Sequence, residues 1–265
     1  HRSEMADIYI ATAERYGHSA IFIHPNPDTV EETGRLIDLI RTRTGDRYFI
    51  MRHGDATFSI PSGSEMMAFA ERLADDPASL KREAAAMVEN ALRRAEVWRE
   101  QRERRGLGLD GFALCSDYCF NVGPFMSPRH FAEFVTPYLA RLTQAYREMG
   151  YYVIKHTDGN IMPILDQLVA TNPHALHSLD PQAGVDIAVV KRLYGDRLCL
   201  IGNVNCAMLD TGTPQQIEEA VLYSLRNGMP GGGYIFSTSN CIYTGMPLAS
   251  YELMLDIWRR EGVYA

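Results

Sequence analysis

Short apolar runs alternate with longer amphipathic runs along this chain, and that alternation constrains the fold more than any other feature. The short runs are rich in β-branched and aromatic residues, which favour strands, and each is followed by a segment with helical periodicity. Strands that alternate with helices predict parallel βαβ units. Seven strands are predicted, over Ala20–His24, Tyr48–His53, Gly111–Ser116, Tyr152–His156, Ala175–Leu179, Leu198–Gly202 and Tyr234–Ser237.

The segments between these strands predict helices, and one further helix precedes the first strand. A proline after a capping side chain, as in Ser127-Pro128 and Thr213-Pro214, marks two of the helix starts. The predicted helices are Glu4–Tyr16, Asp28–Arg43, Ser64–Arg105 with a break near Asp76-Pro77, Pro128–Met149, Ile161–Thr171, Val185–Tyr194, Pro214–Asn227 and Leu248–Glu261.

The order of elements predicts a (β/α)8 barrel, a TIM barrel, whose first strand lies upstream of His1 or is missing from the chain. The whole chain, residues 1–265, is interpreted as one barrel domain with a helical insert over residues 64–105. A doubly wound open sheet is the alternative. That fold would carry a glycine-rich turn after an early strand, and none is found here.

Composition narrows the class of protein. The chain has 265 residues with a formal net charge of −7, and it lacks the basic stripe of a nucleic-acid-binding protein. The run Arg93–Arg105 is interleaved with glutamates, which is typical of a solvated helix face. Five widely spaced cysteines do not form a disulfide framework, so a reducing cytoplasm is expected. No apolar run approaches the roughly 18 residues of a membrane span.

Catalytic residues of an α/β barrel lie at the carboxyl ends of the strands, so the polar residues there are candidates. The segment Tyr152–His156 continues into Thr157 and Asp158. Alternate residues of an extended segment point the same way, so His156 and Asp158 can converge on one point. Imidazole nitrogen with carboxylate suits zinc. The alternative is that both residues only cap a strand and the next helix.

Two further strand ends carry candidates of the same kind. Cys241 follows the last strand and could complete a tetrahedral zinc site with three protein ligands and one open position. Alternatively it is a small buried hydrophobic residue, as free cysteine often is. Cys206 is a weaker candidate for this role. Asp117 follows the third strand and, like Asp158, is a candidate catalytic acid or base.

Other polar strand ends are candidate substrate contacts. Arg52 and His53 end the second strand and could bind an anionic group. Asp180, Asn203 and Asn205 follow later strands and are predicted to bind a polar substrate. Loops are polar in any barrel, so the alternative for all five is ordinary loop chemistry.

Several segments, taken in order, resemble the uroporphyrinogen decarboxylase superfamily. The resemblance covers the chain from about Gly111 to its end, and it implies a (β/α)8 barrel. Its motifs are Gly123–Pro128, Lys155–Asn160 (KHTDGN), Ser178–Pro181, Asp186, Ile201–Val204, Gly231–Ile235 and Ser237–Cys241.

The superfamily has two main branches. The true decarboxylases use no cofactor, bind a tetrapyrrole, and carry an N-terminal arginine-rich motif that is not found in this chain. The cobalamin-dependent methyltransferases bind zinc through a His-x-Cys pair and a later cysteine. His156 and Cys241 match that pattern, whereas Asp158 stands where the first cysteine would be. The chain is therefore more similar to the methyltransferase branch.

The resemblance implies a zinc-dependent enzyme that moves a methyl group between a small methoxy compound or thiol and a corrinoid on a partner protein. Zinc would be held by His156, Asp158 and Cys241, and the resemblance also allows a homodimer. Two alternatives remain at this point: a uroporphyrinogen decarboxylase, which is a lyase, and a barrel that binds a ligand without catalysis.

Overall fold

The computed structural model describes residues 1–24, 29–106 and 108–264. Within these residues, seven parallel strands form one curled sheet in the order β1-β2-β3-β6-β7-β8-β9. All seven correspond to predicted strands, so the α/β barrel architecture is confirmed. The strands are β1 (Ala20–Ile23), β2 (Phe49–His53), β3 (Gly111–Leu114), β6 (Tyr152–His156), β7 (Ala175–His177), β8 (Cys199–Val204) and β9 (Tyr234–Thr238).

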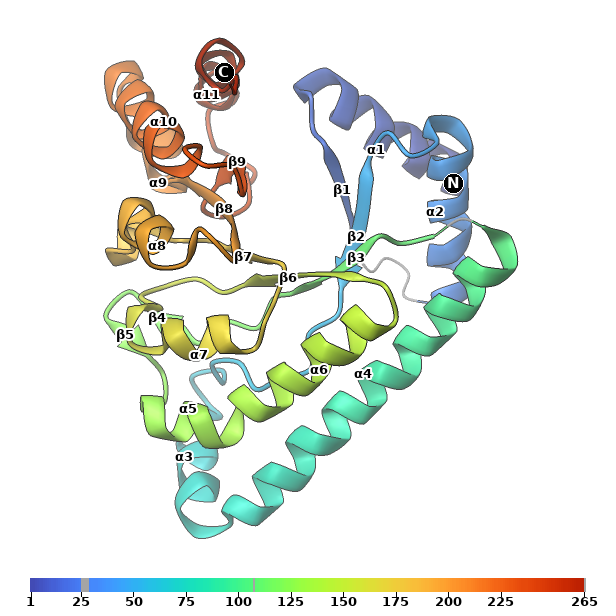
Figure 1. Cartoon of the computed structure of the whole chain (residues 1–265), viewed down its shortest axis with the longest axis vertical. Helices are drawn as coiled ribbons and strands as arrows, with labels where there is room; N and C mark the ends of the chain where they lie inside the picture. Colours follow the sequence, from blue (N-terminus) through green and yellow to red (C-terminus); the bar gives the residue numbers. More distant parts are fainter. Residues whose placement is uncertain (25–28, 107, 265) are drawn as a thin grey trace.

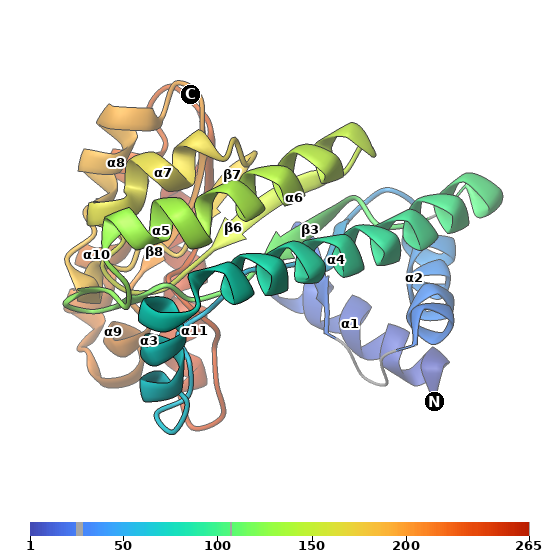
Figure 2. The ribbon, with the colours of Figure 1, turned by 90° about the horizontal axis from the view of Figure 1, so that it is seen from below.

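The helices lie on the outer side of the curl, and the described edge strands β1 and β9 do not pair, so the barrel is open between them (Figure 1). The long helix α4 crosses the outer face beside α6 (Figure 2). The helices are α1 (Arg2–Tyr16), α2 (Val30–Thr44), α3 (Met66–Asp75), α4 (Pro77–Arg105), α5 (Pro128–Phe134), α6 (Thr136–Glu148), α7 (Leu165–Ala170), α8 (Ile187–Tyr194), α9 (Cys206–Thr211), α10 (Pro214–Gly228) and α11 (Leu248–Glu261).

Local capping explains where several helices begin. The predicted break in the helical insert is confirmed, because the side chain of Asp76 accepts from the backbone of Ser79 and starts α4 at Pro77. Thr213 and Gln216 form the predicted capping box of α10. The predicted start of α2 at Asp28 lies outside the described residues. Among the described helices, none is both long and apolar enough to cross a bilayer.

Some elements differ from the prediction. The predicted helix Pro128–Met149 is two helices that meet at Val135, because Pro137 begins a new first turn and has no N–H to donate. The predicted helix Ile161–Thr171 is a 3-10 turn (Met162–Ile164) followed by α7. The elements that were not predicted are α9, a 3-10 turn over Pro181–Ala183, and a hairpin of β4 (Cys119–Phe120) and β5 (Gly123–Pro124) among the described residues.

The register of β6 decides which of its side chains reach the site. Val153 pairs with Phe112 of β3, whose ring stacks on Tyr146 of α6, so this face of the sheet is covered by helices. Val153 and Lys155 are fully buried on that face. Residues alternate along a strand, so His156 lies on the opposite, concave face. It pairs in register with His177 of β7.

Candidate functional site

Asp117, His156 and Asp158 converge at the carboxyl ends of β3 and β6. The Nε2 atom of His156 lies 3.7 Å from Oδ1 of Asp117 and 3.7 Å from Oδ1 of Asp158. One ligand atom of each side chain lies within 4.8 Å of the other two, so the group could hold a metal ion. The predicted convergence of His156 and Asp158 is present, and Asp117 joins them from the neighbouring strand. We call these three residues the site cluster.

The two ionisable groups of β6 and its following loop are perturbed in ways that suit metal ligands. Burial, followed by the influence of His177 and Lys155, lowers the pKa of His156 to about 3, so its ring is neutral at pH 7. Burial and the like charge of Asp117 raise the pKa of Asp158 to about 6. A neutral imidazole with a lone pair therefore faces two carboxylates.

The two carboxylate oxygens of Asp158 differ in their hydrogen bonds. The side-chain amide of Asn240 donates a hydrogen bond to Oδ2 of Asp158. Oδ1 is buried and has no hydrogen-bond partner among the described residues. A buried acceptor without a donor is costly, and here it faces two more acceptor atoms. A proton or a cation at the centre of the site cluster would relieve that cost.

Backbone hydrogen bonds fix the loop that carries Asp117. The N–H of Asp158 donates to Oδ1 of Asp117 at 3.0 Å, and the N–H of Tyr118 donates to Oγ1 of Thr157 at 3.0 Å. Gly159 makes this approach feasible. Its φ is +80°, and a Cβ atom there would lie 2.2 Å from the carbonyl oxygen of Cys119. The carboxylate of Asp117 is thus positioned by main-chain contacts between the two strand ends.

A buried ion pair supports the same loops from the helix-covered side. Nζ of Lys155 lies 2.8 Å from Oδ2 of Asp55 and donates to the carbonyls of Leu114 and Ser116 at 3.1 and 2.9 Å. It also lies 4.2 Å from the centre of the Tyr118 ring. Burial alone would raise the pKa of Asp55, but Lys155 and other hydrogen-bond donors lower it overall. This pair was not among the predicted site residues, although a lysine inside an apolar strand was a usable signal.

Cys241 lies outside the site cluster. Within the described part of the chain, the group of metal-ligating side chains comprises the two aspartates and His156. The Cys241 side chain is exposed on the loop after β9, where its backbone N–H donates to the side chain of Asn240. Cys206 is buried at the start of α9, and its thiol donates to the carbonyl of Asn240. Ligation by Cys241 stays a prediction.

Arg52 and His53 lie in different surroundings from the site cluster. The guanidinium of Arg52 stacks 4.8 Å from the Trp98 ring of α4, in the helix layer. The ring of His53 lies 4.4 Å from Phe22 and 5.4 Å from His24. Burial and the charges of His24 and Arg52 lower the pKa of His53, which weakens it as an anion-binding group near pH 7. Substrate binding by either residue stays a prediction.

The three remaining candidates have clear structural contacts. Asp180 and Asn205 each accept a hydrogen bond from the backbone N–H two residues further on, at the start of a helical turn. Asn203 is buried, where it donates to the carbonyl of Leu179 and accepts from Ser224 of α10. These hydrogen bonds explain why polar residues stand at the three positions, whether or not a ligand binds there. A role in substrate binding stays a prediction for all three.

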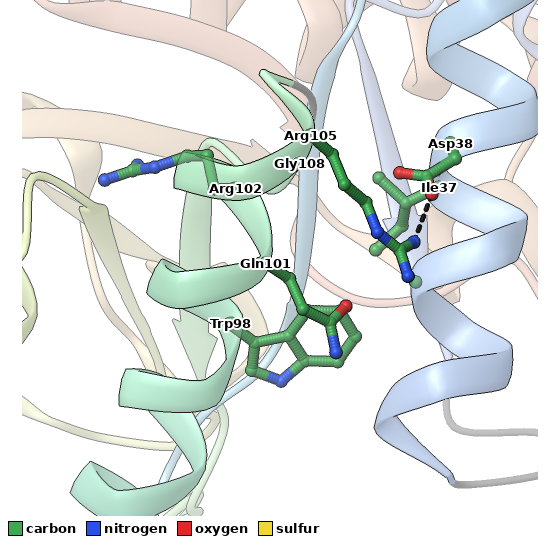
Figure 3. A pocket seen from close by; sticks show the side chains of 8 residues that line it. Ile37, Asp38, Trp98, Gln101, Arg102, Arg105 and Gly108 are labelled. Atoms are coloured by element: carbon green, nitrogen blue, oxygen red, sulfur yellow. Dashed lines mark hydrogen bonds and ion pairs between the residues drawn. The ribbon is translucent and has the colours of Figure 1, made fainter.

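A small pocket between α2 and α4 does not compete with the site cluster as a binding site (Figure 3). Its volume is about 10 Å³, which is room for roughly one water molecule. Arg105 forms an ion pair with Asp38 across it, and Gln101 packs against Gly34. The pocket belongs to the outer helix layer rather than to the strand ends.

Comparison with known proteins agrees with this architecture. The family model described as uroporphyrinogen decarboxylase (URO-D) matches residues 115–261, more than half of the chain. The chain belongs to the uroporphyrinogen decarboxylase family. The match includes the whole site cluster and begins close to Gly111, where the resemblance in the sequence begins. The predicted family is therefore confirmed.

Two curated relatives in the uroporphyrinogen decarboxylase family show how far the similarity extends. The uroporphyrinogen decarboxylase of Chlorobium phaeovibrioides is 29% identical over 144 residues, which are 52% of this chain and 39% of the relative. That of Pseudoalteromonas translucida is 28% identical over 130 residues, which are 45% of this chain and 34% of the relative. The matched segment therefore spans less than half the length of either relative.

A solved structure extends the likeness to nearly the whole chain. A methyltransferase from Methanosarcina mazei superposes with a TM-score of 0.72, covering 98% of this chain and 85% of its own. The sequence identity is 17%, so this similarity establishes a shared fold. The curled parallel sheet is thus the barrel architecture of a known enzyme.

Proposed function

We propose that this chain forms the zinc-binding barrel of a methyltransferase that moves a methyl group between a small methylated substrate and a corrinoid on a partner protein. The observation that carries the proposal is the site cluster, in which three metal-ligand atoms face one another at the strand ends. The name of the Methanosarcina mazei neighbour, a methyltransferase, supports the same class of reaction.

The residues present fit a metal ion. One imidazole nitrogen and two carboxylate oxygens form a donor set that zinc accepts, with a further position open to substrate. Oδ1 of Asp158 is buried and lacks a donor among the described residues, and a cation would satisfy it. Zinc bound there would supply Lewis-acid chemistry, which lowers the pKa of a thiol or polarises a methoxy oxygen.

The residues of the site have different roles in this proposal. His156 and Asp158 hold the ion, and Asn240 keeps the Asp158 carboxylate in one orientation. Asp117 has a side chain that is 45% exposed, so it is accessible to substrate as well as to the ion. In this proposal the Asp117 carboxylate acts as the general base for a thiol substrate or as the general acid for a departing methoxy oxygen.

Exposed apolar side chains at the same end of the barrel suit a docked partner. Phe120 and Val122 lie in the β4–β5 hairpin, next to the site cluster, and are 45% and 92% exposed. Ile242 and Tyr243 follow Cys241 and are 40% and 51% exposed. Contiguous apolar patches around a site mark protein-docking surfaces, and in this proposal these side chains from two loops contribute to one. We assign this rim to the corrinoid-carrying protein.

The proposal is tested first by metal content and then by methyl transfer to free cob(I)alamin from methylated thiols and methoxy compounds. We expect the purified protein to retain zinc, and we expect His156→Ala to lower zinc affinity and transfer by about 100-fold or more. Glu31→Gln, on the exposed surface of α2, is the control. A protein that binds no zinc, or a His156→Ala variant with unchanged transfer, would overturn the proposal.

A cofactor-free decarboxylase is the second candidate. It is favoured by the names of the curated relatives and by the raised pKa of Asp158, which could carry a proton near neutrality. Against it, Arg52, which is a candidate to bind an anionic substrate, stacks on Trp98 in the helix layer. Conversion of uroporphyrinogen to coproporphyrinogen by this chain would establish this activity. Zinc binding without either reaction would identify a binding protein.

A further inference from the structure

A line of hydrogen bonds runs behind the site cluster, away from the two carboxylates. Nδ1 of His156 lies 2.8 Å from Nδ1 of His177, and Nε2 of His177 lies 2.9 Å from the carbonyl oxygen of Thr238. The two rings have centroids 4.9 Å apart. The line therefore connects β6 to β7 and then to the end of β9.

The carbonyl of Thr238 at the end of this line determines which nitrogen atoms of the two rings carry a hydrogen. A carbonyl oxygen only accepts, so Nε2 of His177 must carry the hydrogen. In a neutral ring that leaves a lone pair on Nδ1 of His177. The hydrogen between the two rings then belongs to Nδ1 of His156, and Nε2 of His156 keeps its lone pair.

The opposite tautomers leave bad contacts. If Nε2 of His156 carried its only hydrogen, the Nδ1 lone pair of His156 would face the Nδ1 lone pair of His177 at 2.8 Å. A hydrogen on Nδ1 of His177 would leave its Nε2 lone pair facing the carbonyl of Thr238. Both rings are partly buried, which disfavours a charged imidazolium.

We propose that His177, anchored on the Thr238 carbonyl, is a positioning residue that holds His156 in its Nδ1–H tautomer and directs the Nε2 lone pair into the site cluster. This inference rests on the proposed function, because it assigns the second layer of the same metal site. Metal-binding histidines commonly donate their other N–H to a fixed acceptor, and here that acceptor is another neutral histidine.

Two variants separate this role from mere space filling. His177→Phe keeps a ring but breaks the line, whereas His177→Gln can accept from His156 and donate to Thr238. We expect zinc affinity, measured by chelator competition, to fall about 10- to 100-fold in His177→Phe and to stay within about threefold in His177→Gln. His130→Phe, on α5, is the control and should bind zinc like the wild type.

The tautomer itself is a readout that needs neither zinc nor activity. In the metal-free wild-type protein, nitrogen NMR of His156 should show a protonated Nδ1 and an unprotonated Nε2. A protonated Nε2, or a folded His177→Phe variant with wild-type zinc affinity, would overturn the inference even if methyl transfer were found. Absence of zinc binding by the wild type would instead overturn the proposed function, while the tautomer would still be tested.

Discussion

Lys155 and Asp55 form an ion pair at 2.8 Å in which the lysine is fully buried and the aspartate is 9% exposed. The pair joins the loop after β2 to the strand that carries His156. Taking two charges out of water is unfavourable, and mutual pairing offsets the cost only while both partners are present. The loops of the site therefore depend on a contact that takes no part in the proposed chemistry.

Loss of Asp55 should destabilise the fold strongly. Asp55→Asn leaves the Lys155 charge buried without a counter-charge, so we expect the free energy of unfolding in urea to fall by about 3–5 kcal/mol. Glu31→Gln removes an exposed ion pair and should change it by less than about 1 kcal/mol. Equal effects of the two substitutions would contradict the structural role of the buried pair.

Loss of Asp158 should stabilise the metal-free protein at high pH. The folded-state pKa of about 6 lies above 3.8, the ordinary value for an aspartate, so the folded state binds this proton more tightly than the unfolded state. The penalty is absent below the unfolded pKa, grows as the pH rises from about 4 to about 6, and is constant above that. With a chelator present, we expect Asp158→Asn to gain about 3 kcal/mol at pH 8 and less than about 1 kcal/mol at pH 4. A gain independent of pH would contradict the raised pKa.

Metal affinity should distinguish the two candidate ligand sets. Asp117 faces His156 within the site cluster, so Asp117→Asn should weaken zinc binding about 10-fold or more. Cys241 is exposed and lies outside the group, so Cys241→Ser should stay within about threefold of the wild type. Chelator competition measures both. The reverse order would make Cys241 the third ligand, as the sequence pattern suggests.

A side chain at Gly159 should destabilise the fold for two reasons, the backbone conformation and a steric clash. Its φ of +80° disfavours other residues, and a Cβ atom would lie 2.2 Å from the Cys119 carbonyl. Gly231 has nearly the same φ, +79°, but its Cβ would meet no atom within 4 Å. Gly231→Ala should therefore show the backbone cost alone, about 1–2 kcal/mol.

We expect Gly159→Ala to lose more stability in urea than Gly231→Ala and also to lose zinc affinity, since the displaced hairpin carries Asp117 with it. Circular dichroism of both variants gives the unfolding curves, and chelator competition gives the affinities. A Gly159→Ala variant that binds zinc like Gly231→Ala would show that the close approach does not position Asp117.

The strands were predictable because each is a short apolar run bounded by polar residues. The β6 bounds agree with the prediction at both ends. The convergence of His156 and Asp158 followed from their spacing along an extended segment. The break at Val135 had a signal in the sequence, because Pro137 does not fit a helix interior, but periodicity alone does not show it. The β4–β5 hairpin had no such signal, because its strands are two residues long.

The rest of the site depends on contacts between distant segments. Asp117 reaches His156 because β3 pairs with β6, and the N–H of Asp158 then fixes its carboxylate. The role of His177 likewise depends on the register of β6 with β7. Cys241 follows a strand end as predicted, but the path of the loop after β9 places its side chain in solvent.

Lys155 and His156 are neighbours in sequence but face opposite sides of the sheet, one toward the helices and the other toward the site cluster. Mutational libraries can exploit that division. Varying Asp117 and Asp158 among carboxylate, thiolate and imidazole side chains changes the ligands offered to an ion while the Lys155–Asp55 pair stays intact. Under the proposed function, metal preference can therefore be varied while the buried ion pair that supports the loops is left unchanged.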